Sequence, residues 1–287
     1  MKSPILLAIG ICLVGAAGPA LRGAEKTLPA LFAEAQAAVR SGRAADAIAA
    51  ANQAVALSPT NAECYVVRAR VYAALQEHPK ALIEYMAAAK LAPTDPDIFN
   101  ERGMEQFRLG RVAESVADFD RGLELAPQQK PYHWQRGISL YYAGRYADGV
   151  KQFQLHRTVN PNDVENAVWL FLCAARERGV EAAGRDLIPI SGDTRVPMME
   201  IYALFGGKGT EAGVLAAINA GSPGTREINR RKFYADLYLG LFAEARGESA
   251  KARTLIAQAA QEAPLNDYMG DVARVHASRL SPAAAPR

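Results

Sequence analysis

Cysteine, histidine and an excess of one charge are all scarce in this chain. Its 287 residues include three cysteines and four histidines, and 33 lysines and arginines stand against 30 aspartates and glutamates. Three cysteines are too few for a disulfide scaffold, and a formal net charge of +3 does not suggest the broad basic face that tight nucleic-acid binding needs. Because half of the residues are hydrophobic, we expect a folded protein whose main partner is not a nucleic acid.

Recognised catalytic and metal-binding motifs are missing as well. No HExxH, CxxC or GxSxG run occurs, and His78, His133, His156 and His276 are not clustered at ligand spacing. The glycine-rich run from Gly206 to Thr210 is close to a phosphate loop, but Tyr202 stands where that motif needs its first glycine. An interhelical turn is the favoured interpretation. We therefore expect a protein that is not an enzyme and has no catalytic residue, no cofactor and no metal. The alternative is an enzyme.

The first 24 residues are typical of a secretory signal peptide. Lys2 precedes an uncharged, mostly apolar stretch, and small residues suitable for cleavage follow at Ala17 and Ala20. An uncleaved membrane anchor is the alternative, and it would be the only membrane contact. Lipid attachment at Cys12 is disfavoured because Ile11, rather than a small residue, precedes it. We expect an exported protein.

Prolines recur at a fixed period through the first half of the chain. Pro59, Pro93, Pro127 and Pro161 are each 34 residues apart, and Pro264 returns near the same register after three further periods and one inserted residue. Before each of them lie two stretches with helical spacing of apolar residues, separated by a short turn. This pattern predicts a chain of helical hairpins, each ended by a proline.

The residues within each period resemble the tetratricopeptide repeat (TPR) family. The third unit carries its pattern at five positions, namely Phe99, Gly103, Gly110, Phe119 and Pro127. The second unit carries Ala at the positions where two helices cross, such as Ala81. The resemblance implies an all-α fold, a TPR α-solenoid of antiparallel helical hairpins with a C-terminal capping helix.

The solenoid divides into segments that match the repeat to different degrees. We expect four regular TPR units over 28–161, two degenerate helical hairpins over 162–231, one further TPR unit over 232–264, a capping helix over 265–280 and a disordered tail over 281–287.

The resemblance also implies a concave groove lined by the first helix of each hairpin. The groove residues that we predict to bind a protein segment form an aromatic patch flanked by arginines; they are Arg70, Asn100, Met104, Phe107, Arg108, Trp134, Ile138, Tyr141 and Tyr142. An equally weighted alternative is that Trp134 and Tyr142 pack on neighbouring helices. Arg226, Arg230, Arg231 and Lys232 form a small basic cluster, for which a solvated helix start is the favoured interpretation.

The order of these features is similar to that in the NlpI type of bacterial envelope lipoprotein. An export signal, regular TPR units and an aromatic-rich middle, which includes Trp169, precede a final repeat and a terminal helix. The resemblance implies a periplasmic or envelope adaptor that binds other proteins or peptides, such as envelope proteases or peptidoglycan hydrolases, and that forms homodimers. A structural scaffold that assembles envelope complexes through its convex face and ends is the alternative.

Overall fold

The computed structural model describes residues 26–280, and these residues form helices without any strand. The elements are α1 (Leu28–Arg40), α2 (Ala44–Leu57), α3 (Ala62–Ala74), α4 (His78–Leu91), α5 (Pro96–Arg108), α6 (Val112–Leu125), the 3₁₀ helix η1 (Pro127–Tyr132), α7 (Trp134–Tyr142), α8 (Tyr146–His156), α9 (Val164–Arg178), α10 (Val180–Arg185), α11 (Met198–Phe205), α12 (Glu211–Ala217), α13 (Thr225–Ala245), α14 (Ser249–Glu262) and α15 (Tyr268–Leu280). The predicted signal segment and C-terminal tail lie outside the described residues.

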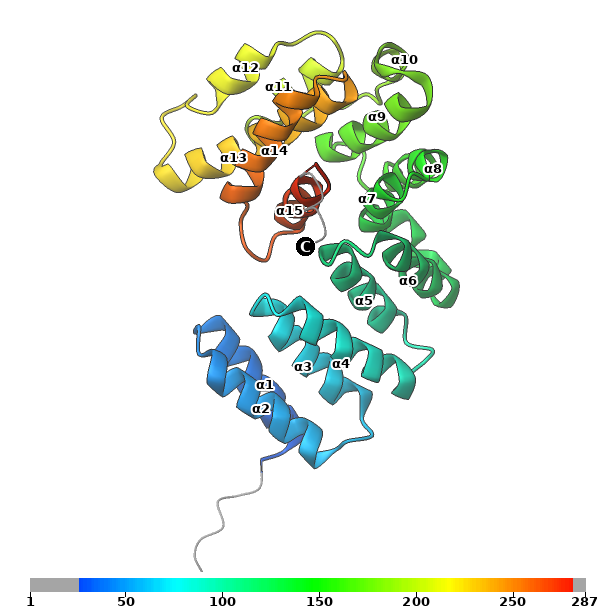
Figure 1. Cartoon of the computed structure of the whole chain (residues 1–287), viewed down its shortest axis with the longest axis vertical. Coiled ribbons are helices and arrows are strands. Elements are labelled where there is room, and N and C mark those ends of the chain that lie inside the picture. Colours follow the sequence, from blue (N-terminus) through cyan, green and yellow to red (C-terminus); the bar gives the residue numbers. More distant parts are fainter. Residues whose placement is uncertain (1–25, 281–287) are drawn as a thin grey trace, which may run out of the picture.

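Consecutive helices pair as antiparallel hairpins, and the hairpins stack into a curved array (Figure 1). Pairs α1–α2, α3–α4, α5–α6 and α7–α8 form the regular part, and α13–α14 forms the last pair. Within the described range, the predicted all-α solenoid of helical hairpins is confirmed.

The turns inside the hairpins need a left-handed backbone, and the sequence supplies it in two ways. Gly110, between α5 and α6, has φ of +72°, which costs glycine little because it has no Cβ. Gln76 has φ of +62° at the corresponding turn between α3 and α4, where a non-glycine residue is under strain. Pro79 lies in the first turn of α4, a place where proline favours a helix start.

The two helices of a hairpin cross at small residues. Ala81 of α4 is completely buried beside Ala69 and Tyr85. A Cβ added at Gly137 of α7 would lie only 2.6 Å from the ring of Phe153 in α8. Because side chains at these positions would push the helices apart, the small residues set the distance between them.

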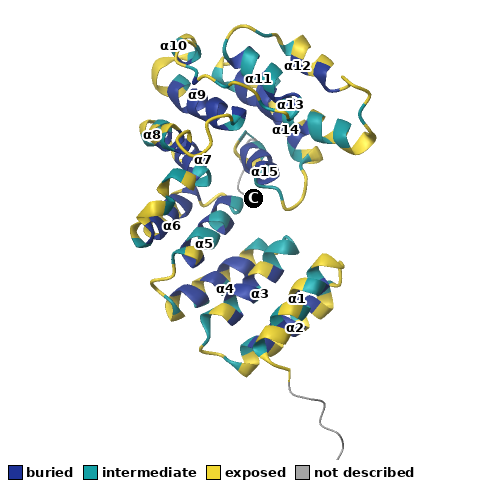
Figure 2. Cartoon of the chain, turned by 180° about the vertical axis from the view of Figure 1, so that it is seen from behind, coloured by how far each residue is buried: buried dark blue, intermediate teal, exposed yellow. Residues whose placement is uncertain are grey.

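The hydrophobic core differs between the two ends of the molecule (Figure 2). From Phe107 to Val275 the buried residues form one continuous cluster rich in aromatic side chains. The helices α1 to α4 instead contribute small separate clusters in which alanine predominates. The N-terminal repeats therefore depend mainly on contacts between neighbouring helices.

The irregular middle has short second helices and one long first helix. The second helices α10 and α12 have 6 and 7 residues, compared with 14 in α6. Helix α13 has 21 residues and starts at Thr225, so the expected boundary between 231 and 232 falls inside it. That boundary needs correction: Ser222 and Gly224 precede the helix, but the polar segment after them belongs to its first turns.

The terminal helix α15 lies on the inner side of the curve (Figure 1). Its start is capped by Asp267, whose side chain accepts hydrogen bonds from the backbone N–H groups of Met269 and Gly270. Helix α15 packs against α14, its neighbour in sequence, and also against α5, which lies far away in sequence. It therefore joins the end of the array to its middle.

Candidate protein-binding site

The polar contacts of α15 are made with the predicted groove. The guanidinium of Arg108 donates a 2.7 Å hydrogen bond to Asp271 of α15 and also pairs with Glu105 on its own helix. Both carboxylates are almost completely buried, with side-chain exposures of 4% and 1%. Arg108 is thus a shared counter-charge of two buried acids, next to His78 at Glu105 and Arg274 at Asp271, and it ties α15 to α5.

Aromatic rings complete this contact. Tyr268 of α15 stacks on Phe107, with ring centroids 5.4 Å apart, and receives the edge of Trp134 at 5.0 Å. Phe107 in turn meets Tyr142 edge to face at 5.5 Å. These rings join α5, α7 and α15 into one packed layer.

His276, near the other end of α15, lies in a buried polar network. Its Nδ1 is 2.8 Å from the hydroxyl of Tyr142, and its Nε2 is 2.8 Å from a carboxylate oxygen of Glu244 in α13. Glu244 also accepts a 2.6 Å hydrogen bond from Arg176. Burial alone would raise the pKa of Glu244, but His276 and Arg176 outweigh it and lower that pKa to about 2.

The structure separates the predicted groove residues into two groups. Phe107, Ile138, Tyr141 and Tyr142 are buried, and Arg108 and Trp134 are held by α15. The expectation of an open groove over these residues needs correction, because α15 fills the space in front of α5 and α7. Arg70, Asn100 and Met104 lie outside this contact, and a protein-binding role for any of the nine residues stays a prediction.

The concave face of the first two repeats is open. A cavity of about 200 Å³ lies between α1 and α3, with Val39, Val67 and Val71 as its apolar surface. Arg40 and Arg70 are at its edge, together with Gln36. Arg40 is exposed and has no ion-pair partner among residues 26–280.

Arg70 also lines a second hollow, between α3, α5 and the segment before α15. It pairs with Glu101 at 3.1 Å while its own side chain stays 53% exposed, and Glu101 accepts a hydrogen bond from Tyr85. Met104 lines the same hollow, whose volume is about 170 Å³. The open cavity between α1 and α3 therefore continues toward α15 along Arg70.

The histidine, cysteine and basic residues outside the groove contact only nearby groups of the protein. His156 is buried, with Nδ1 2.8 Å from the carbonyl oxygen of Pro131, and Cys64 and Cys173 are buried free thiols. In the basic cluster, Arg230 and Arg231 pair with Glu227, and Lys232 pairs with Glu262.

Residues 26–280 contain neither a metal-binding cluster nor a membrane-spanning helix. No three or more His, Cys, Asp or Glu side chains gather there as a metal could require. No helix in the same range has both the length and the apolar character needed to cross a membrane.

Sequence reasoning missed the residues of α15 that fill the groove. Tyr268, Met269, Val272 and Val275 lie on one face of α15, as in a helix that only caps an array. The structure also buries Gly270 and Asp271, outside this face. The sequence pattern gave no signal for this second contact, because it depends on a helix that is distant in sequence.

Comparisons with known proteins agree with this architecture. Residues 32–96 match the tetratricopeptide repeat family. A tetratricopeptide repeat protein from Parabacteroides merdae ATCC 43184 has 16% identity and a TM-score of 0.57, over 86% of this chain and 98% of that chain.

Two further solved structures are also similar. YrrB, described as a TPR protein with an unusual peptide-binding site, has 16% identity and a TM-score of 0.51, over 67% of this chain and 91% of that chain. MamA has 13% identity and a TM-score of 0.51, over 55% and 86%. No curated protein matches the sequence. At such identities the likeness concerns the fold alone, and the matched tetratricopeptide repeat covers residues 32–96.

Proposed function

We propose that this chain is a non-enzymatic adaptor, exported to the cell envelope, that binds a protein segment on the open concave face of α1 and α3. The observation that carries the proposal is the uncovered apolar cavity between Val39, Val67 and Val71. The equivalent face of α5 and α7 already holds a helix, α15, which supports the idea that concave surfaces of this solenoid suit protein segments.

The residues around the cavity define what it would bind. Its valines suit an apolar side chain, and the exposed Arg40 and the half-exposed Arg70 suit a carboxylate next to it. Arg70 is already paired with Glu101, so the unpaired Arg40 is the cation that would bind a carboxylate of the partner. An envelope protease or peptidoglycan hydrolase would qualify as the partner if it presents such a segment.

Affinity capture from crosslinked native envelopes tests this proposal. We would compare the wild-type chain with a Gln36→Trp, Arg40→Glu variant, which fills the cavity and reverses its free charge at two exposed positions. The matched control is Gln154→Trp, Arg157→Glu, which makes the same changes at exposed sites at the end of α8.

We expect the wild-type chain and the control variant to capture the same partner proteins, and the cavity variant to capture them no longer. Binding of the purified partner, measured by calorimetry, should weaken about tenfold or more in the cavity variant alone. Equal retention by all three chains would contradict binding on this face.

A second candidate function, assembly of a complex through the outer surface, is favoured by one observation. Ile83, Met86 and Leu91 of α4 are 63%, 46% and 41% exposed, and Leu57 is 47% exposed. Ile83, Met86 and Leu91 line an open hollow of about 420 Å³. Apolar side chains gathered in this way mark interaction surfaces, and here the proposed occupant is a second copy of the chain.

Sedimentation tests the second candidate. Ile83→Lys, Met86→Lys should shift a dimer of the purified chain toward monomer, whereas Leu215→Lys, Leu265→Lys, at exposed sites elsewhere, should not. A monomeric wild-type chain would contradict self-assembly through α4.

A further inference from the structure

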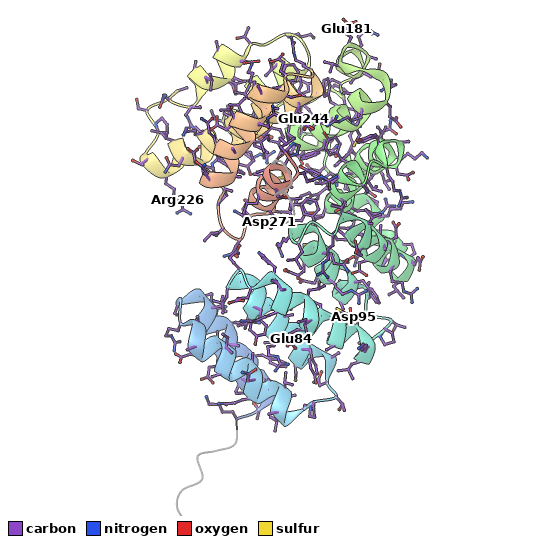
Figure 3. All side chains as sticks on the ribbon, viewed as in Figure 1. Glu84, Asp95, Glu181, Arg226, Glu244 and Asp271 are labelled. Atoms are coloured by element: carbon purple, nitrogen blue, oxygen red, sulfur yellow. The ribbon has the colours of Figure 1, made fainter. Side chains whose placement is uncertain are left out.

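Another cavity lies where the regular repeats are interrupted. It has a volume of about 600 Å³ and is lined by α10, by α11 with the turn after it, and by the end of α13. This size falls within the roughly 300–1,000 Å³ that is usual for ligand pockets. Glu181, at its edge, is at the top of the molecule in Figure 3, far from α1 and α2.

The cavity exists because the second helix of this hairpin is short. Helix α10 has 6 residues where α6 has 14. The missing eight residues correspond to roughly 12 Å of helix. The apolar surface that a longer helix would cover includes the partly exposed Val180, Leu187 and Tyr202, next to the buried Leu204, Phe205 and Phe242.

The rim of the cavity is basic. Arg185, Lys208 and Arg246 line it, each from a different element, against a single acid, Glu181. Arg246 pairs with Glu248 and lies over the ring of Phe242. No ion-pair partner occurs for Arg185 or Lys208 within residues 26–280. In the basic cluster of α13, by comparison, Arg230 and Arg231 share the carboxylate of Glu227.

The backbone of the glycine-rich turn does not provide a phosphate site. The N–H groups of Lys208 and Gly209 both donate to the carbonyl oxygen of Ala203, and that of Gly207 donates to Leu204. A phosphate loop needs such N–H groups free to hold the anion. Any anion at this cavity would therefore be met by the side chains of its rim and not by backbone N–H groups.

We propose that this cavity is a second docking site, for an acidic protein segment that inserts an aromatic or aliphatic side chain between α10, α11 and α13. The apolar floor receives the inserted side chain, and Arg185 and Lys208 pair with carboxylates on either side of it. The site shares no lining residue with the cavity between α1 and α3 and does not depend on the function proposed for that cavity. It would let the adaptor hold two proteins at once.

Fluorescence anisotropy on the purified full chain tests the site. The probe is a labelled ten-residue peptide with a central Leu-Phe pair flanked by glutamates, and the comparison peptide replaces that pair with Ser-Gly at the same charge. The test variant is Arg185→Glu, Lys208→Glu. Its control, Arg157→Glu, Arg226→Glu, changes the net charge equally at exposed residues outside the cavity.

The expected result is saturable binding of the Leu-Phe peptide that weakens about tenfold or more in the test variant and stays within about twofold in the control. The Ser-Gly peptide should bind at least about tenfold more weakly than the Leu-Phe peptide. Equal binding by both variants, or no binding of the Leu-Phe peptide tighter than about 1 mM, would overturn the proposal.

Anionic vesicles provide one further arm. The proposal is wrong, and the cavity contacts a lipid surface, if two results occur together. Phosphatidylglycerol vesicles would bind the wild-type chain but not the test variant, and the Leu-Phe peptide would bind neither.

Discussion

The N-terminal helices α1 to α4 and the region from α5 to α15 are built from similar hairpins but differ in what covers their concave face. In the second region α15 lies in the groove, and one aromatic core runs through the helices around it. In the first region the concave face is open and its cores are small and rich in alanine. Repeats with the same internal packing can therefore provide either a stability element or a free binding surface.

The largest expected effect compares two arginines of the predicted groove, one from each region. Arg108→Leu should reduce the free energy of unfolding by about 2–4 kcal/mol, because the buried Glu105 and Asp271 lose their shared cation and keep only His78 and Arg274 as partners. Arg70→Leu should reduce it by less than about 1 kcal/mol, because the Arg70–Glu101 pair is largely solvated. Urea unfolding curves measure both, and equal losses would contradict the distinction between covered and open concave faces.

The second effect is the pH dependence of stability that His133 causes in the covered region. Burial, together with nearby Arg136, lowers the pKa of His133 from its ordinary value of 6.5 to about 4. The unfolded chain therefore binds a proton that the folded chain excludes, so stability falls as the pH is lowered from 6.5 to 4. His133→Phe should reduce by about 3 kcal/mol the amount by which the free energy of unfolding falls between pH 6.5 and pH 4.

Urea unfolding at pH 7 and pH 4 measures this difference. The ring of His133 meets Phe119 edge to face, so an aromatic replacement keeps the packing. An unchanged pH dependence in the variant would show that His133 is not kept neutral by burial.

The third effect lies in the small alanine cores of the open region. Ala81→Leu should lower the free energy of unfolding by about 1–3 kcal/mol, because Ala81 is completely buried where two helices meet. The control, Ala117→Leu, is exposed on α6 and should stay within about 0.5 kcal/mol of the wild type. A melting temperature unchanged by Ala81→Leu would contradict the assigned repeat register.

The smallest effect lies at the turn between α5 and α6, inside the covered region. Gly110→Ala should cost about 1 kcal/mol, because φ of +72° is unfavourable for a residue with a Cβ. Nothing else lies within 4 Å of the added Cβ, so the cost reflects the backbone alone. Thermal unfolding checks it, and a loss above about 3 kcal/mol would indicate that Gly110 also has a packing role.

Much of the fold could be predicted because repeat positions impose local requirements. Gly42, Gly144 and Gly247 all have positive φ in the turns where the sequence expects them. Pro93 and Pro127 follow directly after α4 and α6 have ended. These features depend on contacts within one hairpin or between neighbours, so a period of 34 residues is enough to reveal them.

The candidate site was harder to predict because its decisive contacts join distant segments. Arg108 and Asp271 are 163 residues apart, and Tyr142 and His276 are 134 apart. Arginine and aromatic side chains on a concave face are equally suited to a foreign protein and to a helix of the same chain. The sequence pattern named the groove residues but could not choose between these two occupants.

By itself, the sequence determined the hairpins, their turns and the small residues at which their helices cross, because each depends on nearby residues. Only the tertiary structure decided which part of the concave face is covered. That depends on the accumulated curvature of the whole array, which brings α15 to α5. Curvature is a sum of small rotations at every repeat interface, and no single repeat encodes it.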